Sequence, residues 1–192
     1  MKYLLFTAAL LCLLPLLHPA QAQSAEEQAA QKAWMDYMTP GPMHEMLAKS
    51  DGEWAFTMTA WMSPDAAPIK STGNAVYSMI LGGRYQQSRS TGNFMDMPFE
   101  GIGTVGYDNA KKVFVSSWID NMGTGITYME GKPDASGKII TFTGKMLDPT
   151  TGKDYDVREV FEWVDDRTHK MEMYSNMSGQ EFKTMELVFT RK

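Results

Sequence analysis

The chain has 192 residues, a formal net charge of −5 and one cysteine. Acidic residues are scattered and no cluster of Lys and Arg occurs, which argues against binding to nucleic acid or to an anionic membrane surface. The single cysteine, Cys12, lies in the apolar N-terminal segment, so the rest of the chain forms no disulfide and its stability has to come from a hydrophobic core.

Residues 1–22 have the features of a secretory signal peptide. Lys2 provides the positive start, an apolar run follows from Tyr3 to Leu17, and Ala20-Gln21-Ala22 is a small-residue cleavage site. The apolar run is too short for a helix that spans a bilayer, which favours a cleaved peptide over a signal anchor. We therefore expect export to the periplasm or the extracellular space, with cleavage after Ala22 and no stable membrane anchor afterwards.

Residues 23–50 are predicted to be helical. Ala, Glu, Gln and Lys dominate Ala25–Met38, and Ser24 is placed to cap the start of this helix. Pro40-Gly41-Pro42 ends it, and Pro42 suits the first turn of a second, short helix that runs through Lys49. One face of the short helix is apolar and should pack on another element; it carries Met43, Met46 and Leu47.

From Gly52 onward the hydrophobic period changes to two, which is typical of strands with one buried face. The first strand is predicted to bury Trp54, Phe56, Met58, Ala60 and Met62. Similar segments follow at about 72–81, 83–91, 98–107, 112–120, 124–131, 138–146, 155–164, 168–175 and 181–191.

The connections between these segments are of hairpin length and leave no room for crossover helices. Residues 51–192 are therefore predicted to form a mainly β domain, an antiparallel up-and-down β-barrel of about ten strands, with one or two helices before it. A barrel is preferred to a sandwich because closure removes the exposed edges of a sheet that no disulfide protects.

The stretch Gly101-Ile102-Gly103-Thr104-Val105-Gly106 matches the G-x-G-x-x-G dinucleotide fingerprint. That fingerprint requires a helix after the strand, whereas here a hairpin turn leads into a second strand, Val113–Trp118. We therefore expect no dinucleotide cofactor. With the turn centred on Asn109-Ala110, Gly101 would lie across from Trp118, and the missing side chain would make room for the indole.

Several motifs occur together in a specific order. Gly52-Glu53-Trp54 resembles the G-x-W that opens lipocalin-like (calycin) barrels. The others are Pro40-Gly41-Pro42-x-His44-x-x-Leu47, Leu81-Gly82-Gly83-Arg84-Tyr85, Phe99-Glu100-Gly101, Gly106-Tyr107-Asp108, Trp118-x-Asp120 and Thr190-Arg191. From Pro40 to Lys192 the chain resembles the domain of unknown function 1579 family, a group of uncharacterised secreted bacterial proteins. The resemblance implies a calycin-like barrel and no established activity.

The resemblance to lipocalin-like barrels also implies how one end is closed. Arg191 on the last strand is expected to stack on Trp54, a cation–π contact worth about 0.5–2 kcal/mol. Both residues would then have a structural role.

The sequence holds no convincing catalytic or zinc site. No G-x-S-x-G occurs, and after the predicted signal peptide the histidines are His44 and His169, neither of them near a nucleophile in sequence. Two distant histidines do not have the spacing of zinc ligands. We interpret His44 as a packed or capping residue. His169 could serve as the inward ligand of a haem-binding barrel, but we expect no such cofactor.

Methionine is unusually frequent, with 17 residues. The pairs Met95/Met97 and Met171/Met173 could offer thioethers to Cu(I). The methionines are dispersed through predicted strands, which favours the interpretation that they fill an irregular core. We therefore expect no metal site.

The barrel interior is the strongest candidate for function. Phe114, Trp118 and Asp120 share one strand face, and Tyr107 lies on the facing strand. Aromatic walls with a few polar groups are typical of a cavity for a small apolar or amphipathic molecule. Arg84 is predicted to project inward and to bind a ligand carboxylate, with Asp120 orienting or neutralising it. An internal Arg84–Asp120 salt bridge in a filled barrel is the alternative.

Three functions stay open at this point. The first is an exported binding protein without enzymatic activity. The second is an envelope enzyme that uses Asp120, Glu159 or His169 as acid–base groups at the barrel mouth. The third is a filled barrel that acts as a structural or interaction module through its N-terminal helices. The ligand and the oligomeric state cannot be derived from the sequence.

Overall fold

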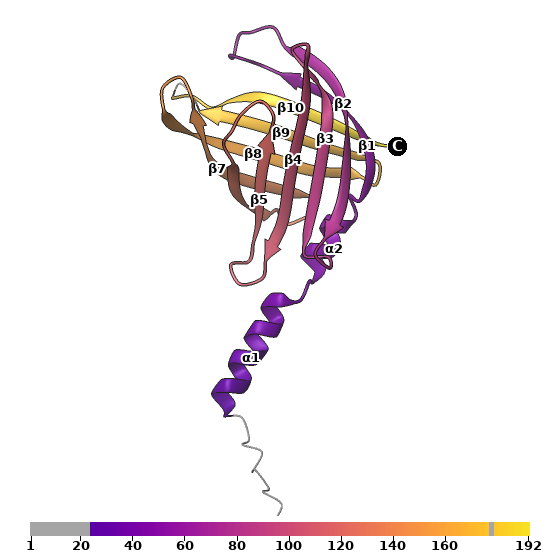
Figure 1. Cartoon of the computed structure of the whole chain (residues 1–192), viewed down its shortest axis with the longest axis vertical. Coiled ribbons are helices and arrows are strands. Elements are labelled where there is room, and N and C mark those ends of the chain that lie inside the picture. Colours follow the sequence, from indigo (N-terminus) through magenta and orange to yellow (C-terminus); the bar gives the residue numbers. More distant parts are fainter. Residues whose placement is uncertain (1–23, 177–178) are drawn as a thin grey trace, which may run out of the picture.

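The computed structural model describes residues 24–176 and 179–192. The predicted signal peptide and its cleavage site lie outside these residues. The elements, shown in Figure 1, are α1 (Ala25–Met38), α2 (Pro42–Ala48), β1 (Gly52–Ala60), β2 (Ile69–Ile80), β3 (Tyr85–Phe94), β4 (Met97–Asp108), β5 (Val113–Asp120), β6 (Thr127–Pro133), β7 (Ile139–Asp148), β8 (Lys153–Asp165), β9 (Thr168–Asn176) and β10 (Phe182–Arg191).

Each strand pairs in an antiparallel manner with the next one along the chain, and β10 pairs with β1. The sheet is thus a closed up-and-down barrel of ten strands, which confirms the predicted fold class. The short connections dictate this topology, because neighbouring strands in the sequence become neighbours in the sheet. None of the helices in the described part of the chain is long and apolar enough to cross a bilayer.

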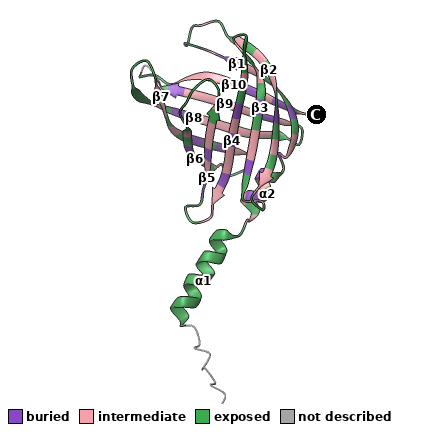
Figure 2. Ribbon diagram, viewed as in Figure 1, coloured by how far each residue is buried: buried purple, intermediate pink, exposed green. Residues whose placement is uncertain are grey.

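Helix α1 has the predicted bounds and stands away from the barrel (Figure 1). Ser24 and Glu27 form a capping box at its start, and none of its residues is buried, so Figure 2 shows it in green throughout. The link to the barrel is polar. The side-chain amide of Asn109, in the β4–β5 turn, donates hydrogen bonds of 3.1 Å to the carbonyl of Asp36 and 2.8 Å to that of Thr39.

Helix α2 lies against one end of the barrel. Leu47 is buried in a core cluster with Phe114 and Ile140, and Met43 and Met46 pack against the same cluster, so the predicted apolar face is confirmed. His44 is buried, and its Nδ1 accepts a hydrogen bond of 3.0 Å from the backbone N–H of Gly41. His44 is therefore a packed capping residue, as the sequence predicts.

The strand pairing fixes which side chains face the axis of the barrel. Trp54, Phe56 and Met58 of β1 point inward, in register with Phe189 and its neighbours on β10. The first strand ends at Ala60, so the prediction that Met62 lies buried on it is wrong: Met62 follows the strand and is exposed.

The predicted register of the β4–β5 hairpin is wrong by two residues. Gly101 pairs with Asp120, and Gly103 pairs with Trp118. The connection spans residues 109–112 instead of a two-residue turn, because Asp108 caps it through side-chain hydrogen bonds to the N–H groups of Ala110 and Lys111. A shift of two residues keeps every side chain on the same face.

The expected role of the glycines survives this change. A Cβ on Gly101 would lie 2.3 Å from Cζ2 of Trp118, and a Cβ on Gly103 would lie 3.2 Å from its Cε3. The indole therefore covers both glycines. The segment continues as strand β4 into β5 with no helix after it, so it lacks the geometry of a phosphate-binding turn.

Candidate binding site inside the barrel

Trp54 and Arg191 close the end of the barrel that α2 covers. Trp54 is 0 % exposed, and its Nε1 donates a hydrogen bond of 2.8 Å to the carbonyl of Ser50. The guanidinium carbon of Arg191 lies 4.4 Å from the ring centroid, so the expected stacking contact is present. The same guanidinium donates to the backbone carbonyls of Asp51 and Lys49, which fastens the chain between α2 and β1 to the last strand.

His169 belongs to this closed end. Its ring centroid lies 3.9 Å from that of Trp54, and the rings of Phe161 and Trp163 flank it, which leaves it 1 % exposed. Burial, with a smaller contribution from the positive charge of Arg191, lowers the pKa of His169 to about 4. The imidazole is thus a neutral, enclosed ring within an aromatic cluster, away from the middle of the barrel.

The middle of the barrel differs from this packed end. Two inward-facing residues, Ala75 and Phe114, are completely buried. At these positions no solvent reaches the residue through the wall of the barrel. Other inward residues keep partial exposure, so neighbouring side chains do not cover them completely. We call this region the accessible interior; it is lined by Tyr77, Tyr155, Glu159, Met171, Met173 and Met185.

Glu159 is the charged residue of the accessible interior. It lies on β8 between Phe142 of β7 and Met173 of β9. No hydrogen bond or ion pair among the described residues involves its carboxylate, and removal from bulk water raises its pKa to about 7. The one fully occluded side-chain polar atom without a partner in the described ranges is Nδ1 of His169, so the oxygens of Glu159 are not sealed off.

Tyr77 is the second polar group in this region. Its ring packs edge-on against Trp54 and Phe189, at centroid distances of 6.4 Å and 6.1 Å. Burial raises the pKa of its hydroxyl, and the negative charge of Glu159 raises it further, which places the two groups within electrostatic reach of each other. The hydroxyl has no hydrogen-bond partner within the described part of the chain.

The predicted ligand residues do not gather in one place. Tyr107 and Phe114 pack against each other beneath α2, with ring centroids 5.0 Å apart. Trp118 and Asp120 lie at the end of the barrel opposite α2, where Nε1 of Trp118 donates a hydrogen bond of 2.7 Å to Oδ2 of Asp120. The other carboxylate oxygen of Asp120 accepts the N–H of Met122, so this side chain is engaged in the rim.

The prediction that Arg84 projects into the barrel is wrong. Arg84 is exposed in the turn between β2 and β3, and its guanidinium donates a hydrogen bond of 3.1 Å to the carbonyl of Leu81. The turn is longer than predicted, because Leu81, Gly82 and Gly83 all adopt positive φ and β3 begins only at Tyr85. Arg84 and Asp120 therefore lie at opposite ends of the barrel and form no salt bridge.

Sequence reasoning missed Tyr77 and considered Glu159 only as an acid–base group. A signal for Glu159 exists, since it interrupts an inward series of apolar residues on β8: Tyr155, Val157, Phe161 and Trp163. The two methionine pairs lie in different environments. Met171 and Met173 face the accessible interior, whereas Met95 and Met97 are exposed at the β3–β4 turn. Within residues 24–176 and 179–192, no group of three or more His, Cys, Asp or Glu is placed to hold a metal ion.

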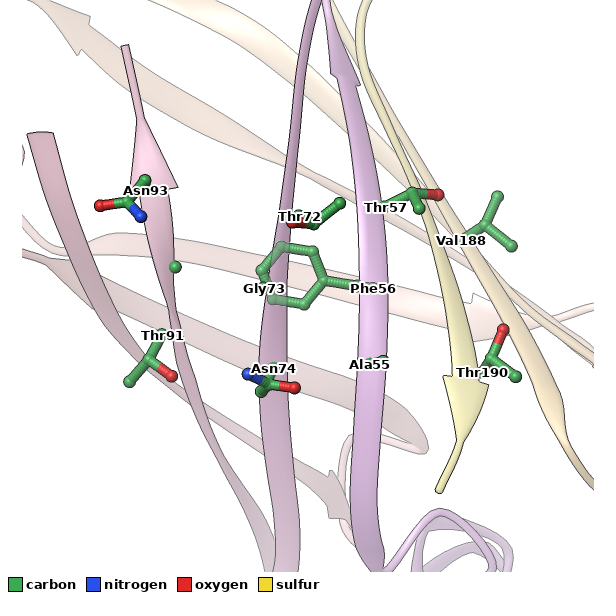
Figure 3. Close-up of a pocket in the computed structure, with 11 residues that line it drawn as sticks. Ala55, Phe56, Thr57, Thr72, Gly73, Asn74, Thr91, Asn93, Val188 and Thr190 are labelled. Atoms are coloured by element: carbon green, nitrogen blue, oxygen red, sulfur yellow. The ribbon is translucent and has the colours of Figure 1, made fainter. Parts of the chain in front are cut away.

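An open groove of about 520 Å³ lies on the outer face of β1, β2, β3 and β10 (Figure 3). It forms where the glycines Gly73 and Gly92 pair across β2 and β3, with the ring of Phe56 beneath Gly73. Its outward side chains are uncharged and face solvent; they include Thr57, Thr72, Asn74, Thr91 and Asn93. The groove offers no desolvated polar group, so we place the candidate site inside the barrel.

The fold defines a closed, ten-stranded up-and-down β-barrel with a polar group in a partly accessible interior. Residues 39–191 match the family described as "Protein of unknown function (DUF1579)", and the chain belongs to this family. The crystal structure of Rv2717c from M. tuberculosis is similar, with a TM-score of 0.60 and 14 % identity over 80 % of this chain and 99 % of that one. At that identity the similarity concerns the fold alone. No curated protein matches the chain.

Proposed function

We propose that the protein binds a small apolar or amphipathic molecule inside the barrel. The observation that carries this proposal is the partial exposure of inward side chains within a closed wall. A completely filled barrel would bury them as it buries Phe114. The surrounding side chains are aromatic rings and thioethers with few polar groups, which is the composition of small-molecule sites.

Methionine suits such a site in a particular way. Met173 and Met185 face each other across β9 and β10, and Met171 lies two residues along β9 on the same face. Unbranched thioether side chains rearrange around ligands of different shape more easily than branched ones do. A carrier that tolerates related molecules is the form of binding that these walls favour.

The cellular setting is part of the proposal. The basic start, the short apolar run and the Ala-x-Ala site of residues 1–22 support an exported protein, and the barrel topology supports a lipocalin-like carrier. In this setting the ligand would be taken up through the end of the barrel opposite α2, where Trp118 and Asp120 form part of the rim.

The enzyme alternative loses support from the geometry. Glu159 pairs with Met173, four residues along β9 from His169, so the two groups are roughly 13 Å apart along the strand at about 3.3 Å per residue. Asp120 is engaged by Trp118 and Met122 at the rim. Acid–base catalysis requires hydrogen-bond reach, which these three groups do not share.

One observation favours an additional interaction role for α1. Its last turns carry Trp34, Met35, Tyr37 and Met38, and all four are between 45 % and 63 % exposed. Exposed apolar clusters of this kind occur at protein–protein contacts. A truncation that removes α1 should leave ligand binding by the barrel unchanged if the two roles are separate.

Fluorescence titration tests the proposed binding function. The neutral probe N-phenyl-1-naphthylamine should gain fluorescence on binding to the purified protein, and n-octanol should displace it. Met173→Trp, which fills the interior, should weaken probe binding at least 10-fold. The control Met62→Trp, at an exposed loop position, should leave it unchanged. Lack of probe binding, together with no copurified small molecule in native mass spectrometry, would refute the proposal.

A further inference from the structure

We propose that Glu159 selects ligands that carry a protonated amine, so that the protein is a carrier of cationic amphiphiles and not of fatty acids. This inference rests on the proposed binding function and adds the charge of the ligand to it. The sequence predicts the opposite charge, because it assigns Arg84 to a ligand carboxylate.

The charges inside the barrel support this choice. Arg84 lies outside in a turn, and Arg191 is held at the closed end by the carbonyls of Asp51 and Lys49. Among the described residues, the neighbours of Glu159 on the inner face of the sheet are uncharged: it pairs with Phe142 on β7 and Met173 on β9, and Val157 and Phe161 lie two residues away on β8. The Tyr77 hydroxyl is within its electrostatic reach. A carboxylate in this setting repels an anionic ligand and attracts a cationic one.

A carboxylate surrounded by protein is costly unless a partner compensates it. Within residues 24–176 and 179–192 Glu159 has no partner, whereas the charged groups on the outer face of the neighbouring strand have one, such as Glu172 with Lys170 and Lys183. Burial without a partner raises the pKa of Glu159 to about 7, so the carboxyl is poised between its two forms near neutral pH. A bound ammonium group would stabilise the ionised form.

The remaining walls fit the rest of such a ligand. Aromatic faces attract cations, and Phe161 lies two residues from Glu159 on the inward side of β8. Met171, Met173 and Met185 offer apolar, polarizable surface to a hydrocarbon or aromatic tail. The Tyr77 hydroxyl, which has no partner among the described residues, is available as a second hydrogen-bonding group.

The test uses three ligands with the same tail and different heads: n-octylamine, n-octanol and n-octanoate. Isothermal titration calorimetry of the purified protein at pH 8 should give the order amine, alcohol, carboxylate from tightest to weakest, with the amine at least 10-fold tighter than the alcohol. Glu159→Gln should abolish this preference, because it should weaken the binding of octylamine at least 10-fold more than the binding of octanol. The matched control is Glu162→Gln, on the outer face of the same strand, which should behave as the parent protein does.

A second readout concerns the proton. At pH 6.5, where a carboxyl with a pKa of about 7 is largely protonated, octylamine binding should release a proton into the buffer, which calorimetry in buffers of different ionisation enthalpy measures. Octanol binding should release none, and neither should octylamine binding to Glu159→Gln. A merely structural Glu159 would change stability without changing this proton count.

The outcomes separate the two proposals. If none of the three ligands and no neutral probe binds, the binding function itself is refuted. If octanol binds but octylamine has no advantage, or if Glu159→Gln keeps the advantage, the binding function stands and the selection of amines by Glu159 is refuted. Tighter binding of octanoate than of octylamine would also overturn the inference.

Discussion

The two halves of the barrel interior use similar side chains in different ways. At the closed end Trp54, His169 and Phe114 are buried. Polar groups around them have partners: Nε1 of Trp163 donates to Ser50, and the Arg191 guanidinium donates to three backbone carbonyls. The exception among the described residues is Nδ1 of His169, which is buried without a partner. In the accessible interior, Tyr77 and Glu159 keep accessible surface, and neither the Tyr77 hydroxyl nor the Glu159 carboxylate has a hydrogen-bond or ion-pair partner within the described ranges.

This difference indicates that the two regions have different roles in the molecule. Matched polar groups and full burial stabilise a fold, whereas unmatched polar groups with accessible surface reduce stability and are retained where they contact something else. We therefore expect the closed end to contribute most of the stability of the barrel, and the accessible interior to contribute the proposed binding function. Substitutions at the two places should differ in what they change.

The largest effect is expected for Trp54→Ala. Loss of a fully buried indole should reduce the free energy of unfolding by about 3–5 kcal/mol. Arg191 would also lose its stacking partner. Urea unfolding followed by circular dichroism measures the change, and Trp34→Ala in the exposed helix α1 is the control, with an expected change of less than about 0.5 kcal/mol. A similar loss in both variants would contradict the assignment of stability to the closed end.

Much of the fold could be predicted from the sequence because the local signals agreed with one another and no tertiary contact overrode them. The period-two pattern, the turn residues and the short connections all indicate one antiparallel barrel, and the caps of Ala25–Met38 follow from Ser24 and Glu27. The expected stacking of Arg191 on Trp54 came from a resemblance to lipocalin-like barrels, and the structure has this contact. These features depend on neighbouring residues or on a motif, both of which a sequence displays.

The site could not be predicted in the same way, because it depends on where a strand ends. In the alternation of the sequence, Arg84 falls on the inward positions. It lies in the turn before β3, however, and the turn places it outside the barrel. The observed β4–β5 register differs from the predicted one by two residues because Asp108 caps a longer turn. Tyr77 on β2 and Glu159 on β8 come from strands that do not pair, yet the charge of Glu159 acts on the Tyr77 hydroxyl, and no local pattern in the sequence reports such an approach across a closed sheet.

The next effect concerns the pH dependence of stability and belongs to the accessible interior. A pKa of Glu159 near 7 in the folded state, above its unfolded value of about 4.5, means that the folded state binds more protons between these pH values. The contribution of Glu159 to the free energy of unfolding should therefore fall as pH rises from about 4.5 to 7. Glu159→Gln removes this loss and should make the protein more stable at pH 8, by at most about 3 kcal/mol, with little change at pH 4.

The difference between parent and variant is the quantity to measure, because His169 and Glu172 act in the opposite direction. Their lowered pKa values, about 4 and about 2, make stability rise with pH over 4–6.5 and 2–4.5 respectively. Both contributions cancel when Glu159→Gln is compared with the parent at each pH. Thermal unfolding of ligand-free protein serves as the readout, and Glu162→Gln should track the parent. An unchanged or lower stability of Glu159→Gln at pH 8 would mean that Glu159 is paired in solution.

Ser50→Ala tests whether matched polar groups are what distinguishes the closed end. Ser50 is fully buried, and its Oγ accepts the hydrogen bond of 2.8 Å from Trp163 Nε1. Its removal leaves that N–H without a partner, which should cost about 1–3 kcal/mol in urea unfolding. Ser78→Ala, at an exposed position of β2, should cost far less. Equal values for the two serines would show that the hydrogen bond contributes nothing measurable.

The smallest effect is expected at the end of the barrel opposite α2, for Gly101→Ala. A Cβ there would lie 2.3 Å from Cζ2 of Trp118, so the indole has to move. Because Trp118 is only partly buried, it can rotate toward solvent, and the substitution should cost about 1 kcal/mol. The movement breaks the Trp118–Asp120 hydrogen bond, which should shift tryptophan emission to longer wavelength. Gly123→Ala, with open space around its Cβ, is the matched control. A loss as large as that of Trp54→Ala would mean that the rim is as rigid as the closed end, and the division between a stabilising end and an adaptable end of the barrel would then fail.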